Sequence, residues 1–206
     1  MTTSIMVNIF TETYVKFFFV LTPFFVVSMF LALTSEMSPE KQRNTAIRTT
    51  LAVILIAFTL FFFGTTLFKI FGITLDSFRI GAGSLLFLSA VQLIQGTKNP
   101  IKSNVDVEDD TDISVVPLAI PVVTGPATIG TLLIMGAQIT DAPTRLASSG
   151  GLLCAILSVG LLMYLAPHIQ RVIGSIGLSI MSKISGLILA ALSAQIVFTG
   201  IKNFLF

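Results

Sequence analysis

Two proline dipeptides are the parts of this sequence best suited to bind a solute. Thr22-Pro23 and Gly125-Pro126 each lie inside a long apolar run. Proline within a helix removes one N–H donor and clashes with the carbonyl four residues earlier, so each dipeptide predicts a break between two half-helices. The half that starts at each proline turns free N–H groups toward the break, and the preceding half offers unpaired carbonyls. Such a pair of breaks would suit a small zwitterion.

Small residues beside the two prolines complete the candidate site. We predict that Thr22 caps the first of these half-helices and that Gly125 supplies unusual backbone angles at the second. An alternative is that the prolines only kink ordinary membrane helices, in which proline is frequent. The candidate substrate-binding residues are Thr22, Pro23, Thr124, Gly125, Pro126 and Thr128.

What the sequence lacks excludes several other chemistries. The chain has one Cys, one His and no Trp, which rules out an intrachain disulfide, a zinc site or a Cys–His catalytic pair. A net charge of +2 is too small and too scattered for a protein that binds nucleic acid. No Asp or Glu lies in the middle of an apolar run, so proton transfer through a buried carboxylate is not expected. We therefore expect no enzymatic reaction, no cofactor and no metal.

The elements that must position the breaks are apolar helices. Of the 206 residues, 54% are hydrophobic and only 11% are charged, and the mean hydropathy is +0.95. A helix needs about 20 apolar residues to cross a membrane. We predict an all-α polytopic membrane protein with six transmembrane helices, of which the first and fourth are broken. The six runs lie at about 10–34, 48–68, 78–96, 113–138, 146–167 and 184–204.

The two halves of the chain resemble each other. Pro23 precedes Pro126 by 103 residues, and Gly96 precedes Gly200 by 104. Three helices in each half make an odd number of crossings, so the second half would enter the membrane from the opposite side. This inverted repeat is found in many secondary transporters. We predict one transmembrane domain over 1–206, with repeat 1 at about 8–96, a polar linker at 97–112 and repeat 2 at about 113–206.

Charged and polar residues near the helix ends bear on orientation and packing. The first, third and fifth loops carry seven Lys and Arg residues against five on the other side, which predicts both termini outside the cytoplasm. We expect Glu12, Asp112 and Arg79 at the membrane interface. Arg79 could instead form a gate ion pair with Asp76 or Asp112. Interhelical hydrogen bonds are expected, in preference to contacts with a substrate, for Gln92, Gln138 and Gln195.

Several motifs together resemble the MarC family of bacterial and archaeal inner-membrane proteins. The resemblance covers nearly the whole chain and implies six helices. Some members of the family are described as transporters of small neutral amino acids, and this is the implied substrate. Where the family usually has Asn-Pro, this chain has Thr22-Pro23, and Phe25 and Ala127 occupy positions where the family usually has glycine. The matching motifs are Leu21-Thr22-Pro23, Leu31-Ala32-Leu33-Thr34, Phe78-Arg79-Ile80-Gly81, the block from Asp112 to Pro121, and Gly125-Pro126-Ala127-Thr128.

We therefore expect a multi-pass plasma-membrane protein that transports small neutral solutes by alternating access. A zwitterionic amino acid and the lipid bilayer are the expected partners, and a coupling ion and the oligomeric state stay open. Alternatives are a non-transporting inner-membrane scaffold, a stress- or drug-response protein, or an exporter of another small metabolite. A transporter needs a polar cavity that meets the two breaks, whereas a scaffold would pack them dry.

Overall fold

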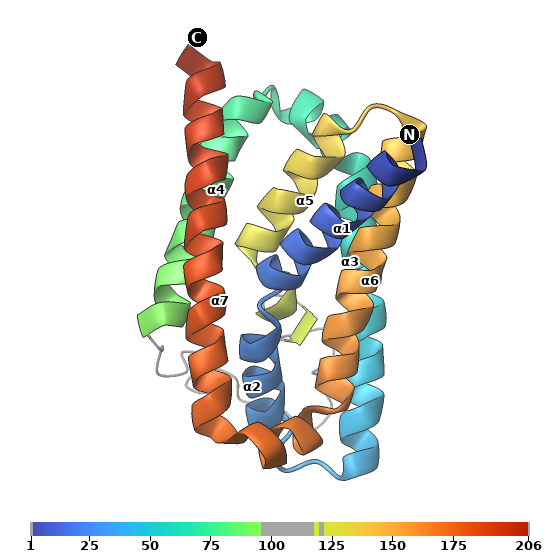
Figure 1. The fold of residues 1–206 in the computed structure, drawn as a ribbon, viewed down its shortest axis with the longest axis vertical. Helices are drawn as coiled ribbons and strands as arrows, with labels where there is room; N and C mark the ends of the chain where they lie inside the picture. Colours follow the sequence, from blue (N-terminus) through green and yellow to red (C-terminus); the bar gives the residue numbers. More distant parts are fainter. Residues whose placement is uncertain (1, 96–117, 120–121, 206) are drawn as a thin grey trace.

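The computed structural model describes residues 2–95, 118–119 and 122–205, and every regular element in these ranges is helical. The predicted all-α class is therefore confirmed. The predicted linker at 97–112, together with Pro117 and Pro121, lies outside the described residues. The helices are α1 (Thr2–Val20), α2 (Pro23–Leu33), α3 (Pro39–Phe71), α4 (Leu75–Gln95), α5 (Pro126–Gln138), α6 (Ala142–Tyr164) and α7 (Ala166–Leu205) (Figure 1).

Four of these helices are long and apolar enough to cross a membrane, namely α4, α6, α7 and the Pro39–Phe63 part of α3. The pair α1 and α2, whose axes differ by 42°, makes a fifth if it counts as one bent span. The apolar part of α5, Ala127–Gln138, is shorter. The count of six spans stays a prediction, because the run that begins at about 113 lies partly outside the described residues.

Local caps explain where several helices begin and end. Ser38 precedes Pro39, the first residue of α3, and its hydroxyl accepts the Lys41 N–H at 3.4 Å. At the start of α6 the Asp141 carboxylate accepts the Thr144 N–H at 2.9 Å. Side-chain acceptors at this position satisfy one of the N–H groups that a helix leaves free. The other end of α3 is closed by Gly72 in the left-handed conformation, with φ 62°.

The helices form a single bundle in which both chain termini lie at the same end (Figure 1). The α3–α4 and α5–α6 connections lie at that end too, which we call the terminal end. The α2–α3 and α6–α7 connections lie at the opposite end. A shared end for the two termini agrees with the prediction, although the side of the membrane on which it lies is not tested.

Each helix of the first half has nearly the same packing partners as the corresponding helix of the second half. α1 packs against α6, and α5 packs against α3. In the same way α2 packs against α7, and α5 packs against α4. The most extensive pair is α4 with α7, which correspond to the predicted third and sixth transmembrane helices. This is the pattern that two similar halves would produce, and the inverted repeat itself stays a prediction.

Glycine lets several of these helix pairs approach closely. A side chain at Gly136 in α5 would collide with the backbone carbonyl of Phe61 in α3. Gly186 of α7 packs in the same way against the carbonyl of Ala90 in α4. Gly186 is buried at this contact, whereas Ala194, two turns further along α7, is exposed. Small residues replace a hydrophobic driving force where helices pack within lipid.

α7 is bent near its start. Gly174 has φ 72° and ψ 169°, a conformation that residues other than glycine rarely adopt. The part of α7 before this residue lies across the end of the bundle opposite the termini, and the part after it runs the length of the bundle (Figure 1). Val172 and Ile176, on either side of the bend, are exposed.

Candidate functional site

The first predicted break is present between α1 and α2. Thr22 separates the two helices with φ 49° and ψ 59°, a left-handed conformation that is unusual for a β-branched residue. The Val26 N–H donates to the Thr22 carbonyl at 3.0 Å, and Pro23 has no N–H. The N–H groups of Phe24 and Phe25 are thus the free donors of the first turn. The expected cap is wrong, however, because the Thr22 hydroxyl makes no capping hydrogen bond within the described chain.

The second predicted break is also present, before α5. The Thr124 N–H donates to the Ala119 carbonyl at 2.8 Å, a bond that spans five residues and ends the preceding turn. Gly125 then has φ −76° and ψ 173°, and Pro126 is the first residue of α5. Any residue adopts these angles, so the prediction of unusual backbone geometry at Gly125 is wrong. The strained residue is Thr22, at the other break.

Polar groups at the second break are only partly satisfied. Because the Ile129 N–H bonds to the Gly125 carbonyl at 3.0 Å, the N–H groups of Ala127 and Thr128 are left free. The Thr128 hydroxyl donates to the Val123 carbonyl at 3.4 Å. The Thr124 hydroxyl is fully buried and has no hydrogen-bond partner among the residues that the structure describes.

The two breaks lie in one protein interior and not against lipid. Val26 follows the first break, Val123 precedes the second, and both belong to a single cluster of buried hydrophobic side chains. Phe25 and Ala127, each just after a proline, pack against a second cluster that α4 and α7 provide. Pro23, Thr124 and Thr128 are buried. Hydrophobic residues beside both breaks therefore belong to one core.

A cavity of about 720 Å³, lined by apolar side chains together with several charged and polar ones, lies between α1, α4, α5 and α7. It runs along α1 from Thr11 to Phe19 and along α7 from Ile188 to Thr199, in the half of the molecule nearer the terminal end. Phe19 is the lining residue nearest in sequence to Thr22. Among the predicted site residues whose side chains the structure describes, none lines the cavity, so the cavity does not meet the two breaks as the transporter prediction required. Its charged or hydrogen-bonding side chains include Glu12, Lys16, Arg79, Gln138, Gln195 and Thr199.

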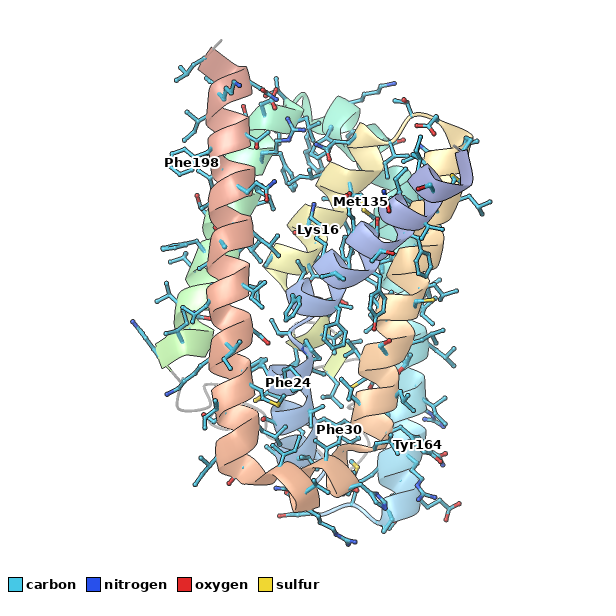
Figure 2. All side chains as sticks on the ribbon, viewed as in Figure 1. Lys16, Phe24, Phe30, Met135, Tyr164 and Phe198 are labelled. Atoms are coloured by element: carbon cyan, nitrogen blue, oxygen red, sulfur yellow. The ribbon has the colours of Figure 1, made fainter. Side chains whose placement is uncertain are left out.

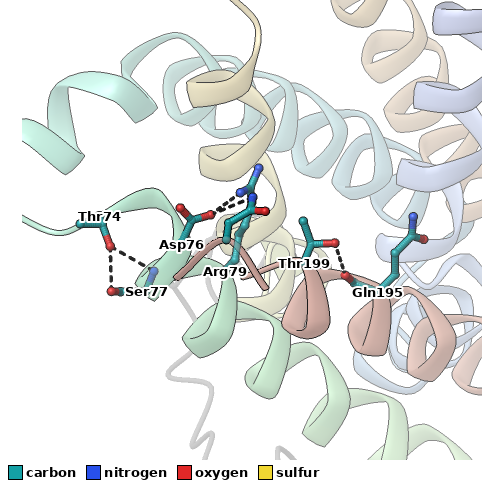
Figure 3. Close-up of polar contacts among 7 residues, drawn as sticks. Thr74, Asp76, Ser77, Arg79, Gln195 and Thr199 are labelled. Carbon is teal, nitrogen blue, oxygen red and sulfur yellow. Dashed lines mark hydrogen bonds and ion pairs between the residues drawn. The ribbon is translucent and has the colours of Figure 1, made fainter. Parts of the chain in front are cut away.

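The side chain of Arg79 is buried within the protein. It is 10% exposed and forms an ion pair with Asp76, one turn earlier on α4 (Figure 3). Asp76 also accepts a hydrogen bond from the Asn203 amide of α7 at 3.5 Å. The alternative ion pair with Asp76 is thus present, and the interface position expected for Arg79 stays a prediction. Asp112 lies outside the described residues.

Lys16 is the cavity residue that sequence reasoning missed. Its side chain, labelled in Figure 2, is half-buried and lines the cavity, and the charges that act on it are those of Arg79 and Glu12. Neither its ammonium nor the Glu12 carboxylate has an ion-pair partner within 4.0 Å among the described residues. A lysine inside the apolar run at 10–34 was the available signal, because ionisable residues within membrane helices are usually functional.

The structure also contradicts the predicted packing role of two glutamines. Gln138 and Gln195 are exposed to the cavity, and in the described part of the chain neither side chain makes the interhelical hydrogen bond that was expected. The Thr199 hydroxyl donates to the backbone carbonyl of Gln195 at 2.7 Å, within α7 (Figure 3). The side-chain amides of both glutamines are therefore available to a molecule in the cavity.

Similarity to known proteins identifies the family to which the chain belongs. The sequence matches the MarC family of integral membrane proteins over residues 7–205. The chain belongs to the MarC family. It is 30% identical to a UPF0056 membrane protein of Aquifex aeolicus, over 96% of this chain and 94% of the relative. Identity to the UPF0056 membrane protein YhcE of Escherichia coli is 29%, over 95% and 93% of the two chains.

A UPF0056 membrane protein of Methanocaldococcus jannaschii is 33% identical over 94% of this chain and 87% of the relative. These MarC relatives come from bacteria and archaea, and their shared name describes a membrane protein without a substrate. No solved structure matches the chain. The protein is therefore an integral membrane protein of the MarC family with several apolar helices.

Proposed function

We propose that this protein transports small neutral solutes, in the first place small neutral amino acids, across the plasma membrane by alternating access. The observation that carries the proposal is the cavity of about 720 Å³ between α1, α4, α5 and α7, whose largely apolar lining contains charged and amide side chains. The half-buried Lys16 and the exposed Glu12 both line this cavity, and charged side chains within membrane helices mark solute pathways in general. A scaffold would have no use for them there.

The interrupted helices supply the second part of the proposed pathway. Free N–H groups begin α2 and α5, and the buried Thr124 hydroxyl has no partner among the described residues. A buried polar group without a partner costs about 1–3 kcal/mol, so its presence calls for an explanation. In this proposal Phe19 and Leu192 separate the cavity from the breaks in one state, and the solute reaches the breaks in another.

The arrangement of the helices suits motion of one half against the other. Each half packs its broken helix against the other half, and α4 and α7 pack along each other. Transporters with inverted repeats move in this way around a central site. We assign the protein no catalysed reaction. We place both termini outside the cytoplasm, because the first, third and fifth loops of the sequence carry more Lys and Arg residues than the other side does.

Counterflow in liposomes tests the proposal. Purified protein is reconstituted into liposomes loaded with unlabelled glycine or alanine, and entry of the labelled amino acid is followed with and without a sodium or proton gradient. We expect labelled solute to accumulate above the level in protein-free liposomes. Absence of counterflow for every small neutral amino acid, with protein that elutes as a single folded species, would refute transport of this class.

A substitution at the second break tests where the pathway runs. Gly125→Leu should abolish counterflow while the protein still inserts and purifies, because the bulky side chain fills the start of α5. Gly81→Leu is the matched control, since Gly81 is exposed on α4 and an added Cβ there meets nothing within 4 Å. Equal transport by the two variants would move the pathway away from Gly125.

A further inference from the structure

Two charged side chains of the cavity have no ion-pair partner among the residues that the structure describes. Arg79 and Asp76 form an ion pair, and Asp76 also accepts a hydrogen bond from Asn203. Lys16 and Glu12 lie one turn apart on α1, yet they form no ion pair within 4.0 Å. The cavity therefore contains one cation and one anion that are free to meet opposite charges on a bound molecule.

This pair of charges discriminates between classes of solute. An amine without a carboxylate would leave the Lys16 ammonium unpaired, and a carboxylate without an amine would leave Glu12 unpaired. A zwitterion can satisfy both. Charge-assisted hydrogen bonds to such groups are stronger than neutral ones, and they gain further strength away from water.

The other side chains that line the cavity fit a small solute held between Lys16 and Glu12. Gln138 of α5 and Gln195 of α7 offer amide groups, and Val15 and Leu192 offer apolar surface for a short side chain. A volume of about 720 Å³ lies within the usual range for small-molecule sites, so water can enter together with the solute. The polar and apolar groups thus converge from α1, α5 and α7.

We propose that Lys16 binds the carboxylate of the solute in the cavity and that Glu12 faces its ammonium, before the solute reaches the helix breaks. This site deepens the proposed function and rests on it. It assigns initial recognition to side chains of α1, whereas the two breaks contribute backbone groups further along the pathway. The site and the breaks can therefore be tested with separate variants.

Affinity measurements on the full-length protein test the proposal. Glycine, glycinamide and acetate are compared as competitors of labelled glycine in counterflow, because glycinamide lacks the carboxylate and acetate lacks the amine. We expect only glycine to compete strongly. Lys16→Gln should weaken glycine binding about ten- to a hundredfold, the loss expected for one charge-assisted hydrogen bond, and Lys16→Arg should recover part of it. Lys202→Gln, at an exposed position near the end of α7, is the matched control.

Chemical labelling gives a second measurement that does not depend on a variant folding. Labelling of Lys16 by an amine-directed reagent is measured by mass spectrometry as a ratio to that of Lys202 in the same sample, because the added amines also consume the reagent. Glycine should lower this ratio, whereas glycinamide should not. Counterflow that is unchanged in Lys16→Gln, or equal protection by glycine and glycinamide, would overturn the Lys16 site while the transport proposal stands. A wild-type protein that transports no amino acid would overturn both.

Discussion

Replacement of Thr22 by glycine should stabilise the fold. Thr22 holds a left-handed conformation that costs an L-residue about 1–2 kcal/mol, and its hydroxyl makes no capping bond within the described chain. Glycine removes that cost but loses about 0.5–1 kcal/mol through the greater freedom of the unfolded chain. The expected net gain in the free energy of unfolding is therefore about 0.5–1 kcal/mol. Thr22→Ala keeps the strained backbone and should gain little.

The single cysteine of the chain provides the assay. Cys154 is half-buried in α6, so a dye that becomes fluorescent on reaction with thiols reports its exposure on heating in detergent. For a chain of this size, 1 kcal/mol corresponds to about 2–4 °C in melting temperature. Thr59→Gly, at an exposed position within α3, should lower the melting temperature, because glycine weakens a regular helix. A Thr22→Gly variant that melts no higher than Thr22→Ala would refute the argument from backbone strain.

Two further predictions concern packing and pH. Gly136→Ala should destabilise the fold by about 1–3 kcal/mol, because its new methyl group meets the Phe61 carbonyl, whereas Gly81→Ala should not lower the same melting temperature. The hydrogen bonds from Thr144 hold the pKa of the Asp141 carboxyl below its ordinary value. Its contribution to stability is therefore complete above about pH 4 and lost as the pH falls through the lower folded pKa. Asp141→Ala should lower the melting temperature at pH 7 and have a progressively smaller effect in acid, and a constant difference at all pH values would contradict this cause.

The sequence predicted the breaks because their cause is local. Proline at positions 23 and 126 cannot continue a helix whatever surrounds it, and both helices begin at these residues. The backbone angles at the breaks could not be predicted in the same way. They depend on how each half-helix packs, and packing placed the left-handed residue at Thr22 and the ordinary extended one at Gly125.

The cavity was harder to predict because its lining comes from both halves of the chain. Arg79 and Asp76 are three residues apart in one helix, so spacing alone could suggest their ion pair, and it did. Lys16 and Gln195 are far apart in sequence and line the same cavity only because α1 and α7 lie on either side of it. Spacing along a chain does not reveal which helices face each other. Lys16 was therefore counted only among the basic residues that predict the orientation in the membrane.

The bend at Gly174 has a practical consequence for attaching probes to this protein. An added Cβ at this residue would meet nothing within 4 Å, so there is space for a side chain. Its torsion angles nevertheless exclude any side chain without local rearrangement of α7. Spectroscopic labels or cross-linkers for that end of the molecule belong at the exposed neighbours Val172 and Ile176, where the helix can carry them unchanged.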